Sequence, residues 1–480
     1  HQGPGLTNTM TGLTEAAKSR TPLLLLAADT AASALRSNFR IEQDALVRAV
    51  GAVPERQHGP ATAVQDAARA YRRALAERRA VVLMMPLDVQ AAPAPEGAAA
   101  LPAPARVRPP RPSDAAIEEA AGALARAQRP LIIAGRGAVV ADAREPLEAL
   151  GDALGALLAT SANGNGLFAG NRWALGISGG FASPAAAELI AEADVVLAVG
   201  ATLNMWTTRH GRLVSPSATV VQVDADADAL GAHHRVDIPV QGDAAEAVRA
   251  LLEELGRRGH ESPGWRSEEV AARIAGGTWK VTPYADAGTD ELIDPRTLSA
   301  ALDDLLPAER TLAVDSGHFM GYPPMYLGVP DAQGFVFTQA YQSVGLGLGS
   351  AIGAAVARPD RLTVAALGDG GTMMALPELE TVARLGLRML IVVYNDAAYG
   401  AEVHHFGPQG HPVDIVRFPD VDFAALARAV GLEGVTVRGA GDLEVVTRWL
   451  ADGGRPALLL DARVVPTVVA EWLEEAFRGH

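Results

Sequence analysis

Short apolar runs alternate with stretches of helical periodicity along most of the chain. The runs at residues 21–29, 80–89, 193–203 and 218–226 consist mainly of Leu, Val, Ile, Met and Ala. Continuous apolar runs of this kind are typical of strands that are buried on both faces of a parallel sheet. Because helical stretches separate them, the pattern predicts βαβ units. We therefore expect an α/β fold of three consecutive doubly wound parallel-sheet domains.

Two stretches rich in proline, glycine or charge interrupt this alternation. They cover residues 93–112 and 257–291. Prolines remove backbone donors and favour extended chain, so both stretches are interpreted as linkers. The expected domains are then 1–92, 113–256 and 292–480.

The segment 362–400 contains most of the candidate chemistry. Its pattern predicts a buried strand over 362–367, a helix over 375–385 and a second strand over 389–394. A right-handed crossover of this length makes the two strands parallel, so the loops after both strands emerge at the carboxyl edge of the sheet. Asp369 in the first loop and Asp396 in the second are then expected to face each other across one cleft.

Two facing carboxylates repel each other and are costly to desolvate. A divalent cation such as Mg²⁺ or Ca²⁺, bridged to a phosphate, removes that cost. Gly368, Gly370 and Gly371 beside Asp369 would let backbone N–H groups approach phosphate oxygens. From this segment alone, a tight turn with two solvent-exposed aspartates is the alternative.

Composition narrows the class of protein. The chain of 480 residues has a net charge of -15 and contains no cysteine. The negative charge disfavours nucleic acid and anionic membranes as partners. The lack of cysteine excludes disulfides, thiolate catalysis and zinc–sulfur sites, and it fits a cytoplasmic protein.

Several motifs in order give the chain a family resemblance. They are a GPG-x-T-N segment that starts at Gly3, the strand VVLMMPLDV, the segments VDSGHF and QSVGLGLGS, and GDG at 368–370 followed by the pair Asn395–Asp396. The chain resembles the thiamine diphosphate-dependent enzymes of the acetolactate synthase, pyruvate decarboxylase and benzoylformate decarboxylase group. The resemblance implies that residues 1–92 are the C-terminal half of a pyrimidine-binding domain, that 113–256 are a central domain and that 292–480 bind diphosphate and magnesium.

The resemblance also implies roles for individual residues. Mg²⁺ would be held by Asp369, Asp396 and the backbone carbonyl of Ala398. The residues expected to bind thiamine diphosphate are Gly317, His318, Val344, Gly368, Gly370, Gly371, Thr372 and Tyr399. Val344 would lie under the thiazolium ring; the alternative is a plain core valine. Asp396 stands where the family usually has asparagine, and Asn395 is the alternative ligand.

The glutamate that activates the cofactor in this family lies upstream of the GPG segment, and the chain starts at that segment, with His1 and Gln2. We expect the first domain to be N-terminally incomplete. A segment omitted from the sequence, a second polypeptide that supplies it, and a non-catalytic relative are the three explanations. His1 aligns with an active-site histidine of some family decarboxylases, so His1 and Gln2 are catalytic candidates; a surface histidine is the alternative.

The segment 399–411 is expected to bear on the substrate. It contains Glu402, His404, His405 and His411, and it lacks the tryptophan that acetolactate synthases place near 405. His404 is a catalytic candidate, whereas a polar lid or a metal site are other readings of the cluster. The resemblance implies decarboxylation of a 2-keto acid with carboligation; a simple decarboxylase and a non-catalytic cofactor-binding subunit are alternatives. It also implies a homodimer or homotetramer with the active site between subunits, whereas FAD is possible but not favoured.

Overall fold

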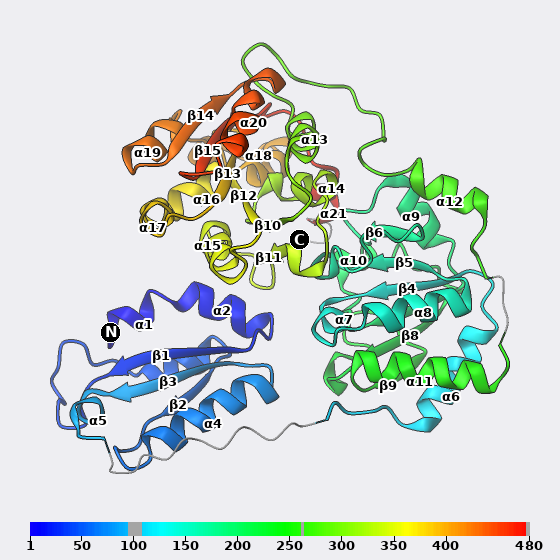
Figure 1. The fold of residues 1–480 in the computed structure, drawn as a ribbon, viewed down its shortest axis with the longest axis horizontal. Coiled ribbons are helices and arrows are strands. Elements are labelled where there is room, and N and C mark those ends of the chain that lie inside the picture. The colour runs from blue at the N-terminus through cyan, green and yellow to red at the C-terminus, as the bar shows by residue number, and fades with distance from the viewer. Residues whose placement is uncertain (95–107, 261–263, 477–480) are drawn as a thin grey trace. The chain divides into compact units, whose positions relative to one another are not determined.

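The computed structural model describes residues 1–94, 108–260 and 264–476. Within these residues the chain forms three sheets, and every pair of neighbouring strands in them is parallel (Figure 1). The predicted α/β fold with parallel sheets is confirmed. Clustering of contacts gives two compact units, His1–Arg108 with Thr338–Leu346, and Pro109–Phe337 with Gly347–His480.

The first unit contains a three-stranded sheet in the order β1-β3-β2. Its strands are β1 (Leu23–Asp29), β2 (Val53–Arg56) and β3 (Ala80–Pro86), and its helices are α1 (Pro4–Thr7), α2 (Met10–Lys18), α3 (Gln43–Ala49), α4 (Ala63–Ala76) and α5 (Leu87–Ala91). Alternate residues of β3 enter different cores: Val82 and Met84 join one cluster, and Val81 and Leu83 join another. The middle strand is therefore buried on both faces, as its uninterrupted apolar sequence predicts.

The second unit begins with a six-stranded sheet in the order β6-β5-β4-β7-β8-β9. Its strands are β4 (Pro130–Ala134), β5 (Leu157–Thr160), β6 (Ala174–Ile177), β7 (Val195–Val199), β8 (Thr219–Asp224) and β9 (Ile238–Gln241). The helices around it are α6 (Asp114–Ala125), α7 (Arg136–Val140), α8 (Arg144–Leu154), α9 (Pro184–Ala191), α10 (Met205–Thr208), α11 (Ala244–Arg257) and α12 (Glu268–Ala275). Two separate clusters of buried residues cover its two faces.

The same unit contains a second six-stranded sheet in the order β11-β10-β12-β13-β15-β14. Its strands are β10 (Arg310–Val314), β11 (Phe335–Phe337), β12 (Leu362–Gly368), β13 (Met389–Asn395), β14 (Glu433–Val437) and β15 (Leu458–Arg463). The helices are α13 (Pro295–Leu305), α14 (Tyr322–Tyr326), α15 (Gly347–Ala357), α16 (Asp369–Met374), α17 (Glu378–Arg384), α18 (Gly400–Phe406), α19 (Phe423–Ala429), α20 (Glu444–Ala451) and α21 (Glu471–Ala476).

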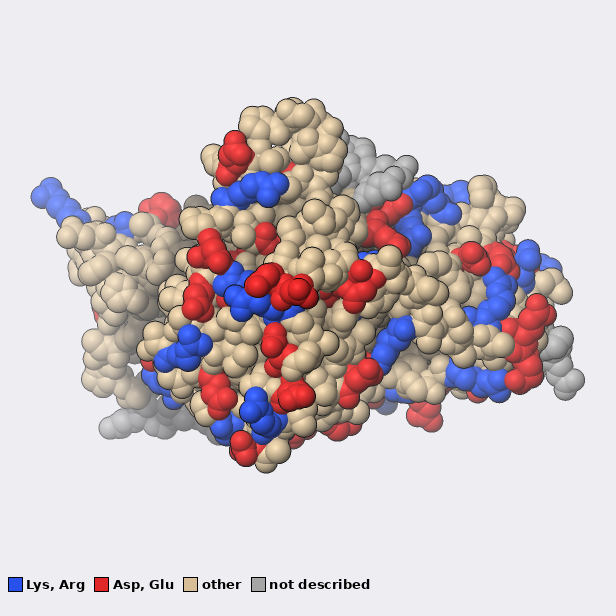
Figure 2. Space-filling model, turned by 90° about the horizontal axis from the view of Figure 1, so that it is seen from above, with Lys and Arg blue, Asp and Glu red and all other residues tan. Residues whose placement is uncertain are grey.

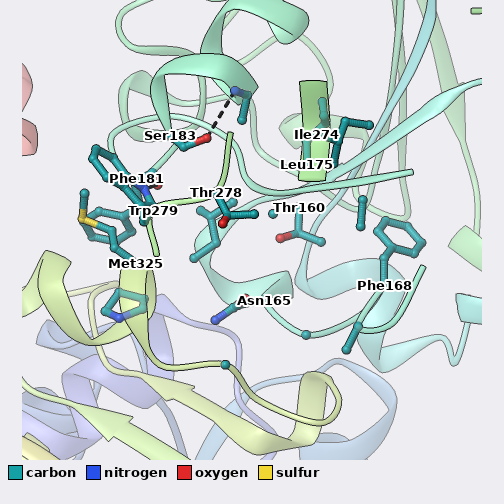
Figure 3. Close-up of a pocket in the computed structure, with 18 of the residues that line it drawn as sticks. Thr160, Asn165, Phe168, Leu175, Phe181, Ser183, Ile274, Thr278, Trp279 and Met325 are labelled. Atoms are coloured by element: carbon teal, nitrogen blue, oxygen red, sulfur yellow. Dashed lines mark hydrogen bonds between the residues drawn. The ribbon is translucent and has the colours of Figure 1, made fainter. Parts of the chain in front are cut away.

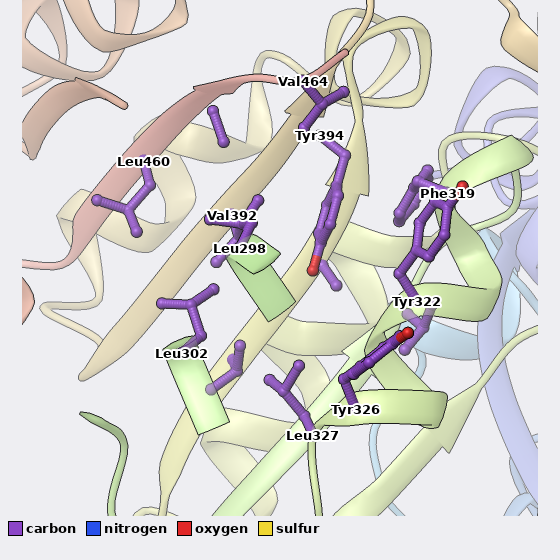
Figure 4. Packing of buried hydrophobic residues seen from close by; sticks show 14 of the residues in the cluster. Leu298, Leu302, Phe319, Tyr322, Tyr326, Leu327, Val392, Tyr394, Leu460 and Val464 are labelled. Atoms are coloured by element: carbon purple, nitrogen blue, oxygen red, sulfur yellow. The ribbon is translucent and has the colours of Figure 1, made fainter. Parts of the chain in front are cut away.

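One face of this sheet packs around aromatic side chains (Figure 4). Val392 and Tyr394 of β13 lie in this cluster, whereas Ile391 and Val393, which alternate with them along the strand, lie in the cluster on the opposite face. The Tyr394 ring stacks on Phe319 with 5.2 Å between ring centroids, and its hydroxyl lies 2.8 Å from the hydroxyl of Ser299. A satisfied hydroxyl and a stacked ring fix the end of β13 firmly.

The structure corrects two sequence-based boundaries. The helix predicted over 375–385 is α17, which begins later, at Glu378, and an additional short helix that was not predicted, α16, precedes it and begins at Asp369 itself. Pro377 lies between them and cannot donate the backbone hydrogen bond that a continuous helix needs. The predicted linker 257–291 includes α12, whose Val270 is buried in a core of the preceding sheet. Most of the other predicted linker, 93–112, lies outside the described residues.

The surface and the helices add two observations. Figure 2 shows acidic and basic side chains interspersed over the visible face, without a large basic area. In the described part of the chain, every helix is too short or too polar to cross a membrane.

Candidate diphosphate and metal site

Two loops meet at the carboxyl edge of the last sheet. β12 and β13 are adjacent and parallel, with Gly368 paired with Tyr394 in the register. Asp369 directly follows the end of β12, and Asp396 directly follows the end of β13. The predicted crossover is therefore present, and it brings both loops to one edge of the sheet.

The strand order brings a third loop, the one after β10, to the same edge of the sheet. The chain runs from β10 outward to β11 and then returns to β12 on the other side of β10. The crevice at such a switch in strand order is where open α/β sheets bind ligands. Gly317 and His318 follow β10, and Asp369 follows β12, so these loops flank that crevice.

Asp369 is held rigidly. It is 4% exposed, and its carboxylate accepts hydrogen bonds from the backbone N–H of Gly370 at 2.7 Å and of Ala398 at 3.1 Å. The second bond reaches from the loop after β12 to the loop after β13. It ties the two loops together and orients the carboxylate before any ligand binds.

Asp396 lies close to this carboxylate. Burial raises the pKa of Asp369, and burial together with the negative charge of Asp369 raises the pKa of Asp396. Such shifts mark two acidic groups that cannot both be charged at low cost in the same site. A divalent cation between them would remove both causes.

Asn395 has a different role in the structure. Its amide donates to the carboxylate of Asp461 at 2.8 Å, and its carbonyl accepts from the N–H of Ala397 at 3.2 Å. Asn395 is 4% exposed and belongs to β13. Its amide groups are thus occupied inside the core, which favours Asp396 over Asn395 as the candidate ligand.

Close packing explains several glycines of the site. A Cβ on Gly370 would lie 2.4 Å from the ring of Tyr399, and a Cβ on Gly400 would lie 2.3 Å from a carboxylate oxygen of Asp396. Gly317 has φ 145°, a conformation that side chains rarely adopt. The Thr372 hydroxyl donates to the carbonyl of Gly368 at 2.7 Å and so stabilises the loop. This bond occupies none of the backbone N–H groups of the loop. Gly371 is buried in the same turn.

His318 and His404 lie beside this crevice with 4.5 Å between ring centroids. Nε2 of His318 accepts the N–H of Ala470 at 2.9 Å, which leaves the proton on Nδ1. Burial, with a smaller contribution from His404, lowers the pKa of His318 to about 3, so the ring is neutral. Burial also lowers the pKa of His404, whose buried Nε2 has no hydrogen-bond partner among the described residues.

The structure disperses the other polar residues of the segment 399–411. His405 and His411 both pack against Phe406, whereas His404 packs against His318. Among the residues that the structure describes, no three His, Asp or Glu side chains gather as a metal site. The metal candidate is therefore the two carboxylates with the Ala398 carbonyl, and not a histidine cluster.

Three candidate residues belong to the first unit. His1 packs edge-on against Phe39 at 4.9 Å, and its Nδ1 lies 2.7 Å from the carbonyl of Gln2. Val344 lies in Thr338–Leu346, which groups with this unit. The proposed roles of His1, Gln2 and Val344 at the crevice stay predictions.

Sequence reasoning missed supporting residues. Asp461 on β15 receives the Asn395 amide, and Glu15 accepts the N–H groups of Ala340 at 3.2 Å and Tyr341 at 2.7 Å. Neither residue belongs to a motif, and their partners are distant in sequence. Only the folded structure reveals such pairs.

Comparisons with known proteins agree with the geometry. Residues 117–251 match the family described as thiamine pyrophosphate enzyme, central domain, and residues 315–460 match the thiamine pyrophosphate enzyme, C-terminal TPP binding domain. The probable 2-ketoarginine decarboxylase of Pseudomonas aeruginosa is 31% identical over 94% of this chain and 79% of its own length. The sulfoacetaldehyde acetyltransferase of Alcaligenes xylosoxydans xylosoxydans is 28% identical over 91% of this chain and 76% of its own. The acetolactate synthase large subunit of Parasynechococcus marenigrum is 28% identical over 94% and 73%, respectively.

Proposed function

We propose that this chain, which belongs to the thiamine diphosphate-dependent enzyme family, decarboxylates a 2-keto acid and transfers the remaining carbon unit to an acceptor carbonyl, as an acetolactate synthase-like carboligase. The observation that carries the proposal is the pair of buried Asp369 and half-buried Asp396 beside the glycine-rich turn at the switch in strand order. The relatives named as an acetolactate synthase and a sulfoacetaldehyde acetyltransferase support a transfer step.

The chemistry of the donor set fits Mg²⁺. Asp369, Asp396 and the Ala398 carbonyl are hard oxygen donors, and a divalent cation would offset the desolvation and repulsion that raise the pKa values of the two acids. Gly370, Gly371 and Thr372 would face the diphosphate from one side. Gly317 and His318 would face it from the other side.

When bound, the cofactor supplies the carbon nucleophile and the electron sink that loss of CO₂ requires. The protein's part is to bind, orient and protect. The neutral His318 can donate from Nδ1 without adding positive charge, and the unpartnered Nε2 of His404 can accept or return a proton at the substrate. The Phe319–Tyr394 stack supports the loops that follow β10 and β13.

FAD is not part of the proposal. Decarboxylation followed by carboligation involves no net oxidation, so neither step needs a redox cofactor. We further propose a homodimer or homotetramer in a cytoplasmic setting, acting on a small-molecule 2-keto acid.

A simple 2-keto acid decarboxylase is the second candidate. The identity of 31% to the probable 2-ketoarginine decarboxylase favours it. In that case protonation would replace transfer to the acceptor, and His404 would supply the proton.

A panel of 2-keto acids, assayed with thiamine diphosphate and Mg²⁺, tests both candidates. CO₂ release together with a coupled product supports the carboligase, and CO₂ release with only an aldehyde supports the decarboxylase. Absence of CO₂ from every keto acid, despite a cofactor-dependent rise in melting temperature, would instead identify a non-catalytic cofactor-binding subunit.

A further inference from the structure

A cavity of about 410 Å³ lies away from the diphosphate crevice, along the outer edge of the central sheet (Figure 3). Its walls come from several parts of the second unit: the end of β5, β6 with the turn before it, α9, the end of α12 with the segment after it, and α14 with the residues that follow it. β6 is the edge strand of its sheet, so no further strand covers this side. Ligand pockets in proteins are of this size.

The walls are mostly apolar and partly aromatic, with a few uncharged polar side chains. Phe168, Phe181, Trp279 and Met325 line the cavity together with aliphatic side chains. The Trp279 indole donates to the carbonyl of Phe181 at 2.8 Å, which fixes the ring as part of the wall. Flat aromatic walls favour flat apolar ligands.

The walls carry no charge. Among the described residues that line the cavity, none has an Asp, Glu, Lys, Arg or His side chain. An ionised ligand would lose its hydration there and gain no opposite charge. Phosphorylated and carboxylated molecules are therefore poor occupants, which separates this cavity from the diphosphate crevice.

One buried polar group points to an occupant. Thr160 is 3% exposed, and its hydroxyl has no hydrogen-bond partner in the described part of the chain. Figure 3 shows this oxygen directed toward Thr278, with the Asn165 amide nearby. A buried hydroxyl without a partner costs free energy, and a ligand that pairs with it recovers that cost.

We propose that this cavity binds a neutral, largely aromatic small molecule with one hydroxyl or carbonyl group, and that this group pairs with the Thr160 hydroxyl. The aromatic part lies between Phe168, Phe181 and Trp279. The site is independent of the keto acid and of the cofactor.

The probe is 2-naphthol, with 2-naphthoate as its charged counterpart, titrated by calorimetry against the full chain. We expect 2-naphthol to bind and 2-naphthoate to bind at least tenfold more weakly, because its carboxylate has no partner in the cavity. Thr160→Val keeps the shape of the side chain and removes the hydroxyl, so it should weaken 2-naphthol binding roughly threefold to tenfold.

Two further variants make the test specific. Thr311 on β10 is also buried, and its hydroxyl also lacks a partner among the described residues, but it does not line the cavity. Thr311→Val should leave 2-naphthol binding unchanged. Ala169 lines the cavity, so Ala169→Phe should fill part of it and abolish binding, with the melting temperature verifying the fold.

The proposal is overturned if 2-naphthol does not bind, if 2-naphthoate binds as well as 2-naphthol, or if Ala169→Phe remains folded and binds normally. Equal loss in Thr160→Val and Thr311→Val would also overturn it, since the effect would then be structural.

Discussion

At the scale of single residues, the site depends on two carboxylates that the protein brings together at a cost. Desolvation and mutual repulsion raise the pKa of Asp396, and Asp369 is fixed by two backbone N–H groups. The sequence predicted this pair from the crossover and the spacing of the motifs. It could not predict that Asn395 turns into the core, because its partner Asp461 is 66 positions away.

Asp396→Asn should show separately what the carboxylate pair costs in folding stability and what it contributes to cofactor binding. The metal-free protein should gain roughly 1–2 kcal/mol of unfolding free energy, because asparagine needs neither a desolvated charge nor the proton that folded Asp396 retains. The melting-temperature increase produced by Mg²⁺ with thiamine diphosphate should shrink. Asp360→Asn, at an exposed carboxylate that pairs with Arg358, is the matched control and should change neither quantity much. Asparagine keeps an oxygen ligand, so Asp396→Ala tests the metal role itself, and a full cofactor response in that variant would argue against it.

The pair also predicts a pH dependence. Because the pKa values of both acids are raised in the folded state, the unfolded chain releases these protons first as pH rises. The stability contribution is complete below the ordinary carboxyl pKa of about 4 and is lost as pH rises through the folded values. The melting temperature of the metal-free protein, measured from pH 5 to 8 and compared with that of Asp396→Asn, should fall more steeply in the parent. Parallel curves would contradict this.

At the scale of elements, two short helices, α16 and α18, begin at residues of the candidate site and so position its loops. α16 begins at Asp369 and α18 begins at Gly400. Periodicity predicted the strands around them well, because buried strands have uninterrupted apolar sequences. It missed α16, whose first turn contains Gly370 and Gly371, and it started the next helix at 375, whereas α17 begins at Glu378 after Pro377.

Gly400→Ala tests the close approach at the start of α18. The new Cβ would lie 2.3 Å from an Asp396 oxygen and 3.2 Å from Cβ of His318, so one of them must move. We expect a loss of about 1–3 kcal/mol and a weaker cofactor-dependent melting shift. Gly349 in α15 has open space around its Cβ position, so Gly349→Ala should stabilise the protein by up to about 1 kcal/mol without affecting that shift. Equal effects in the two variants would show that packing at Gly400 is unimportant.

At the scale of the whole molecule, the sequence predicted the class of fold and the three sheets. It did not predict which parts form one compact unit, because side chains from distant segments decide this. Trp472 of α21, for example, packs against Phe181 and Trp206 of the central part, with ring centroids 6.2 Å and 5.9 Å apart. His210 also lies 2.8 Å, through Nε2, from the carbonyl of Glu475.

Trp472→Ala should therefore destabilise the second unit by about 3–5 kcal/mol, because a large buried ring is lost at the contact between its two sheets. Urea unfolding followed by circular dichroism should show a lower midpoint, or a separate early transition. The exposed Tyr341 offers a control, since Tyr341→Ala should leave the midpoint of this unit unchanged. An unaltered midpoint in Trp472→Ala would mean that α21 contributes little to the unit.

The hydrogen bond from Ala398 to Asp369 and the raised pKa values of Asp369 and Asp396 have one further consequence. Near neutral pH, Asp396 in the metal-free protein retains a proton that a bound cation must displace, so cation binding is an exchange reaction. Calorimetric heats of Mg²⁺ binding should then vary with the ionisation enthalpy of the buffer. Their slope would count the protons released, and apparent affinity should increase as the solution becomes more alkaline.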